Sequence, residues 1–219
     1  MGAGSPKLND VQINRLNRQM KESICKIIIN KKEKGFGFLC IIPQTKIKLL
    51  ITEPNTLNEN DINNKTNLEI FLNNIFIQIK TDIPRAIYMD QKNEIMILEI
   101  KNEDNMEKFT TFLEYEENID INDPNKVYKK KDIYILPYEL KVEHKYPVGK
   151  IQYINKNDYS IEHNCENIDK QNKFFGPILL LESLTVIGFN KKKDFGILLK
   201  KFIDEFEKLV KEKLEKKDN

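Results

Sequence analysis

The sequence has few of the residues that build metal sites or disulfide frameworks. It contains three cysteines among 219 residues, Cys25, Cys40 and Cys165, and none of them forms a Cys-x-x-Cys pair. An odd number of widely spaced cysteines favours reduced thiols over a disulfide framework or a zinc site. We therefore expect an intracellular, cytoplasmic protein without a bound metal.

Excess charge and long apolar runs are also missing. The 36 basic residues nearly balance the 34 acidic ones, so the formal net charge is only +2. A chain so close to neutral lacks the electrostatic attraction that drives binding to nucleic acid or to an anionic membrane. No apolar run reaches the roughly 20 residues of a membrane helix, and the N-terminus lacks the apolar core of a signal peptide. We expect neither nucleic acid nor a membrane among the binding partners.

Several motifs of nucleotide and metal chemistry are absent as well. The chain has no G-x-x-x-x-G-K-[ST] phosphate loop, no Rossmann glycine fingerprint and no H-E-x-x-H zinc motif. We therefore predict no cofactor.

The chain does contain many short, apolar, β-branched segments separated by Asn, Asp, Gly or Pro. Such a pattern is typical of antiparallel barrels and sandwiches. The polar, turn-rich stretch 114–126 divides the segments into two sets, which predicts a mainly β protein of two packed antiparallel barrels. The predicted strands are 24–29, 36–42, 47–52, 68–79, 86–89 and 95–100, then 132–136, 139–144, 148–154, 159–163, 177–181, 184–189 and 195–198.

A helix is expected near each end of the chain. Apolar residues at near-helical spacing over 10–22 predict a short N-terminal helix, and a longer amphipathic helix is expected near the C-terminus. We expect the second helix to pack its apolar stripe on the second barrel. The predicted parts are an N-terminal extension over 7–23, a first barrel over 24–113, a second barrel over 127–198 and a C-terminal helix over 199–216.

Two groups of segments resemble the trypsin-like serine peptidase family, whose fold is the chymotrypsin-like double barrel. The family reads G-x-G-F and L-L-T-x-x-H in the first barrel, and G-x-S-G-x-P-[IL] followed by V-I-G in the second. This chain has Gly35-Phe36-Gly37-Phe38 with Leu49-Leu50-Ile51-Thr52, and Gly176-Pro177-Ile178 with Val186-Ile187-Gly188. The resemblance covers roughly residues 24–206, as one trypsin-like unit that ends with the C-terminal helix at 216.

The same resemblance implies that the catalytic slots are degenerate. In the family, an imidazole takes the proton of a serine hydroxyl and a carboxylate orients the imidazole. An Asn amide is not basic and a phenyl ring offers no nucleophile, so the resemblance implies a pseudoprotease that is not an enzyme and that binds a protein or peptide partner as an interaction or scaffolding module. The slots of base, carboxylate, nucleophile, oxyanion Gly and following Gly hold Asn55, Glu94, Phe174, Asn172 and Phe175.

Two alternatives remain open. The chain could be an active hydrolase whose nucleophile is Cys165, Ser160 or Ser183, and Cys165 shares a strand face with His163 two residues away. It could instead be a structural subunit of a larger assembly. For the two histidines, His144 and His163, we expect ordinary strand residues that hydrogen bonds satisfy.

Overall fold

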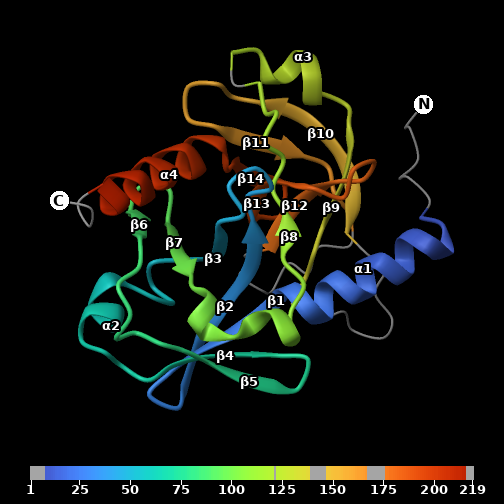
Figure 1. Cartoon of the computed structure of the whole chain (residues 1–219). Coiled ribbons are helices and arrows are strands. Elements are labelled where there is room, and N and C mark those ends of the chain that lie inside the picture. The colour runs from blue at the N-terminus through green and yellow to red at the C-terminus, as the bar shows by residue number, and fades with distance from the viewer. Residues whose placement is uncertain (1–7, 121, 139–146, 167–175, 216–219) are drawn as a thin grey trace. The chain divides into compact units, whose positions relative to one another are not determined.

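The computed structural model is mainly β and describes residues 8–120, 122–138, 147–166 and 176–215 (Figure 1). Its contacts divide the chain into two units. Unit 1 consists of Met1–Met20 and Glu114–Lys200, and unit 2 consists of Lys21–Leu113 and Lys201–Asn219. Each unit is built on one barrel-like antiparallel sheet. The prediction of a mainly β fold with two barrel-like sheets, a short N-terminal helix and a C-terminal helix is confirmed.

The sheet of unit 2 follows the strand order β5-β4-β1-β2-β3-β7-β6, and the two-residue strand β8 (Leu113–Glu114) pairs with β2. Residues that point inward along these strands form one core, in which Ile27, Leu39, Leu50, Ile70 and Leu98 are fully buried. The strands are β1 (Ile24–Ile29), β2 (Lys32–Ile41), β3 (Lys48–Thr52), β4 (Leu68–Leu72), β5 (Ile75–Ile79), β6 (Ile87–Asp90) and β7 (Ile95–Ile100).

The predicted run 68–79 is a hairpin rather than one strand. Leu72 pairs with Ile75, so Asn73 and Asn74 form a two-residue turn, with φ angles of 47° and 62°. Asn tolerates this left-handed conformation better than most residues, and a turn with two positive φ angles matches the twist of antiparallel strands. The Asn-Asn pair therefore breaks the apolar run.

The C-terminal helix α4 (Lys200–Glu215) belongs to unit 2 from Lys201 onward. Its side chains bond to the strands and loops of the first sheet. The Tyr88 hydroxyl donates to Glu205 Oε2 at 2.5 Å, and Lys213 Nζ donates to the carbonyl oxygen of Arg85 at 2.8 Å. The prediction that this helix packs on the second barrel is therefore wrong, because an apolar stripe at helical spacing does not specify which sheet covers it.

Unit 1 contains a closed barrel with the strand order β10-β11-β14-β13-β12-β9. The helix α1 (Asp10–Ser23) joins this unit through Gln19, whose Oε1 accepts the Tyr134 hydroxyl at 2.7 Å in a buried bond. The predicted strand 139–144 lies outside the described residues. The strands are β9 (Asp132–Ile135), β10 (Val148–Ile154), β11 (Ser160–His163), β12 (Gly176–Leu180), β13 (Val186–Lys192) and β14 (Phe195–Leu198).

The short helices complete the two units. Unit 1 has α3 (Pro124–Tyr128), and unit 2 has α2 (Glu59–Asn63) and the 3₁₀ turns η1 (Asn102–Asp104) and η2 (Met106–Lys108). No helix in the described part of the chain has the length and apolarity needed to span a membrane.

A buried ion pair joins distant loops of unit 2. The Arg85 guanidinium faces the Asp104 carboxylate in a two-point contact, at 3.0 Å for Nη1 and 3.2 Å for Nη2. The two side chains are 1% and 0% exposed. Asp104 also accepts the backbone N–H groups of Lys80 and Lys101, each at 2.9 Å. A buried charge is tolerated only with such compensation, so this pair holds residues 80–85 against η1.

We predict that Asp104→Ala destabilises the protein by about 3–5 kcal/mol, because it leaves the Arg85 charge buried without a partner. Urea denaturation measures this loss. Glu103→Ala is the matched control, since Glu103 is exposed next to Asp104 and its removal should change stability by less than about 0.5 kcal/mol. Equal effects of the two substitutions would contradict this role of the ion pair.

Candidate active site

The turn after β3 carries Asn55, and two hydrogen bonds hold it in place. Thr52, the last residue of β3, is buried and donates its hydroxyl to the carbonyl oxygen of Phe36 on β2 at 2.7 Å. The Thr56 N–H donates to the Glu53 carbonyl at 2.9 Å and closes the turn. Asn55 lies at the exposed tip of this turn.

The Gly-x-Gly motif of β2 exists because this turn and β3 lie very close to β2. A Cβ atom at Gly35 would lie 2.4 Å from Thr56 Oγ1, and one at Gly37 would lie 2.9 Å from the carbonyl oxygen of Ile51. Carbon atoms do not approach oxygen that closely without displacement, so only glycine fits. The motif that suggested the peptidase family therefore has a structural cause in this chain.

The carboxylate slot, Glu94, lies at the same end of the sheet as Asn55. Strand β3 pairs with β7 so that Thr52 faces Met96. Asn55 follows Thr52 by three residues and Glu94 precedes Met96 by two, and both residues are exposed. Glu94 has a φ of 51°, in the left-handed region, at the end of the turn between β6 and β7. Unit 2 thus brings together two of the five predicted slots.

The other three slots, Phe174, Phe175 and Asn172, lie outside the described residues, as does His144. Gly176 and Pro177 begin β12 and are buried. Their predicted roles in the nucleophile turn stay predictions.

His163 is a satisfied core residue, as expected. It is 3% exposed, its Nε2 lies 2.7 Å from Asn190 Oδ1, and its Nδ1 accepts the Cys165 N–H at 3.4 Å. Because Nδ1 accepts a hydrogen bond, the ring proton sits on Nε2 and is donated to Asn190. Both ring nitrogens are occupied, and burial lowers the pKa of the imidazole. His163 is therefore not placed to take a proton from a nucleophile.

The three alternative nucleophiles differ sharply in exposure. Cys165 is buried, and burial raises the pKa of its thiol, which disfavours the reactive thiolate. Ser160 is also buried. Ser183 is exposed, its Oγ lies 2.6 Å from Thr185 Oγ1, and Thr185 donates to Glu116 Oε2 at 3.0 Å. Since the Thr185 proton goes to Glu116, the Ser183 hydroxyl donates to Thr185.

Metal chemistry has no candidate centre in the part of the chain that the structure describes, because no three His, Cys, Asp or Glu side chains group closely enough to hold an ion. The cysteines Cys25, Cys40 and Cys165 are free and buried.

Comparisons with known proteins establish the fold. No protein-family model and no curated protein matches the chain. Among solved structures it is similar to Deg5, at 14% identity over 91% of this chain and 95% of that chain, with a TM-score of 0.57. It is similar to the serine endoprotease from Yersinia pestis, at 11% identity over 94% and 68% of the two chains, with a TM-score of 0.59. Kallikrein-related peptidase 10 matches at 8% identity over 89% and 98%, with a TM-score of 0.56.

These similarities confirm the chymotrypsin-like fold and correct one prediction. The prediction that the chain is not an enzyme is contradicted, because the fold that it shares is the fold of an endoprotease and a peptidase. The prediction rested on Asn55 and Phe174 in two slots of one motif. Those residues exclude the Ser–His relay at these positions, but they do not exclude every other nucleophile.

We predict that Gly35→Ala destabilises the protein by about 1–3 kcal/mol, because its methyl group collides with Thr56. In a Thr56→Ala background the cost should fall by about 1 kcal/mol, and a double-mutant cycle from urea denaturation measures the coupling. Asn55→Ala, at the exposed tip of the same turn, is the control and should change stability by less than about 0.5 kcal/mol. Additive effects of Gly35→Ala and Thr56→Ala would show that the two residues are not in contact.

We also predict a pH-dependent stability that depends on His163. Burial lowers its pKa from the ordinary value of 6.5, so the folded state binds this proton less readily than the unfolded chain. The contribution of neutral His163 to the free energy of unfolding is fully present above pH 6.5. It is lost as the pH falls from 6.5 through the pKa of the folded state. Urea midpoints measured at about pH 7.5 and 5.5 should differ less in His163→Gln than in the unsubstituted protein. An unchanged difference would assign the pH dependence to other groups.

Proposed function

We propose that this protein binds polypeptides, and that its ligand is an extended segment of a partner chain. The observation that carries the proposal is the intact frame around the turn after β3, in a fold shared with an endoprotease and a peptidase. A polypeptide is the ligand that the names of those two proteins imply. Fold alone does not fix function, so the proposal needs a surface that can hold a peptide.

The edge strand β5 supplies such a surface. It stands at one end of the strand order of unit 2, whereas the barrel of unit 1 is closed. An edge strand presents unpaired N–H and C=O groups, to which an extended peptide adds as a further strand. Phe76 on β5 is 61% exposed, and its ring lies 4.7 Å from that of Phe71 on β4. This aromatic pair offers an apolar side chain of the peptide a contact beside the main-chain bonds.

Peptide-bond hydrolysis is a second candidate, and one observation in unit 1 favours it. Ser183 is exposed, its hydroxyl donates to Thr185, and the Thr185 hydroxyl donates in turn to the Glu116 carboxylate. A serine whose proton points to an acceptor keeps its oxygen lone pairs free for attack. Of the three nucleophiles considered, it is the one that a substrate could reach.

The binding proposal predicts that Phe76→Ser weakens the binding of a labelled extended peptide by about fivefold or more, because an exposed aromatic contact is lost. Fluorescence polarisation with peptides chosen from a library measures the affinity. Val11→Ser is the matched control, since Val11 is 77% exposed and belongs to α1 rather than to the sheet of unit 2. Peptides that are N-methylated at alternate positions should also bind weakly. If both serine variants bind like the unsubstituted protein, β5 is not the peptide site.

The hydrolysis proposal predicts cleavage of library peptides that Ser183→Ala abolishes and that Cys165→Ala leaves intact. Mass spectrometry of the peptides after incubation identifies the products. Cleavage that survives Ser183→Ala would assign the nucleophile elsewhere. Binding without any cleavage would reject the second candidate and leave the first in place.

A further inference from the structure

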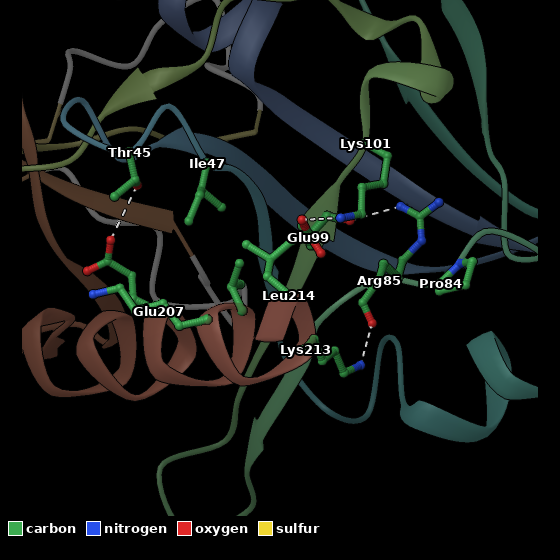
Figure 2. A pocket seen from close by; sticks show the side chains of 11 residues that line it. Thr45, Ile47, Pro84, Arg85, Glu99, Lys101, Glu207, Lys213 and Leu214 are labelled. Carbon is green, nitrogen blue, oxygen red and sulfur yellow. Dashed lines mark hydrogen bonds and ion pairs between the residues drawn. The ribbon is translucent and has the colours of Figure 1, made fainter. Parts of the chain in front are cut away.

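Unit 2 contains a pocket between α4 and the loops at one end of its sheet (Figure 2). Its volume is about 360 Å³, which lies within the range of small-molecule sites in proteins. The walls are largely apolar, with Ile47 before β3 on one side and Val210 and Leu214 of α4 on the other. Leu214 is 57% exposed, so part of this apolar surface faces solvent.

The charged groups of the pocket do not balance. Both carboxylate oxygens of Glu99 have partners within the protein: one pairs with Lys101, and the other accepts the Ala86 N–H at 2.8 Å. Arg85 is neutralised by Asp104. These four charged groups therefore cancel in two pairs.

Two lysines and one carboxylate remain. Lys211 and Lys213 of α4 line the pocket with Glu207, which leaves one positive charge in excess. Lys213 donates to a neutral acceptor, the carbonyl oxygen of Arg85, and Glu207 Oε1 accepts the Thr45 hydroxyl at 3.3 Å. Within the described ranges, neither lysine has a carboxylate at ion-pair distance. An ammonium with one neutral acceptor has two further N–H groups to donate.

We propose that this pocket binds an amphiphilic carboxylate. Its apolar part packs against Ile47, Val210 and Leu214, and its carboxylate accepts hydrogen bonds from the lysine side of the pocket. The single excess positive charge matches one carboxylate, whereas a polyanion such as a nucleotide would have to desolvate its charges against apolar walls. This site is separate from the β5 edge and does not depend on the proposed function.

Two sources supply the same chemistry, namely a free fatty acid and the apolar C-terminal residue of a polypeptide. Decanoate is the probe for the first, and acetyl-Gly-Gly-Leu with a free carboxylate is the probe for the second. Isothermal titration calorimetry should detect saturable binding of at least one of them. Decylamine and the amide-capped peptide carry the same apolar groups without the carboxylate and should not bind.

Variants on α4 test the pocket itself. Replacing both Lys211 and Lys213 with Gln should weaken binding about tenfold or more, and Leu214→Asp should do the same by placing a carboxylate at the apolar wall. These three residues are exposed, so folding should be retained, which circular dichroism checks. Lys208→Gln is the matched control, because Lys208 is exposed on α4 outside the pocket and its removal should leave affinity unchanged.

Binding of decanoate alone identifies a lipid-type ligand, and binding of the peptide alone identifies a chain terminus. No saturable binding of either probe below about 1 mM overturns the proposal. Equal affinity of decanoate and decylamine, or equal affinity in the Leu214→Asp and Lys208→Gln variants, overturns it as well.

Discussion

The close approach of β2 to β3 and to the turn after it is the constraint on which the candidate active site of unit 2 depends. Gly35 and Gly37 permit this approach, and the hydroxyl of Thr52 fixes it by bonding to the Phe36 carbonyl. With β2 and β3 in this relation, the pairing of β3 with β7 brings Asn55 and Glu94 to one end of the sheet. The position of Asn55 thus depends on two glycines that carry no chemistry of their own, and that of Glu94 depends on the register between β3 and β7.

Much of the fold could be predicted because strand signals are local. The strands β7, β10 and β14 have the predicted bounds, since each is an apolar run between turn residues. The hairpin at Asn73 was missed because an apolar run on both sides outweighed the two turn residues. The sheet on which α4 packs could not be predicted. An apolar stripe along a helix indicates that this face is buried, but not which sheet buries it.

The candidate sites were less predictable than the fold. Asn55 and Glu94 lie at the same end of the sheet, but their assignment to catalytic slots stays a prediction. The expectation that hydrogen bonds satisfy His163, as they do most histidines in strands, is confirmed. The motif did not justify excluding an enzyme, because it describes one relay only. The α4 pocket and the β5 edge have no signal in the sequence, since the pocket joins Ile47, Arg85 and Lys213 from three separate segments and an edge exists only in a completed sheet.

The division of the chain between the units has a consequence for synthesis. Unit 2 is formed by residues 21–113 together with the segment that begins at Lys201, so its sheet emerges from the ribosome well before the helix that belongs to it. Until α4 has been made, Tyr88 on β6 lacks the ring of Phe202 that lies beside it in the folded protein. Completion of unit 2 therefore waits until the segment from Lys201 onward has been made, and apolar surface exposed before then favours aggregation.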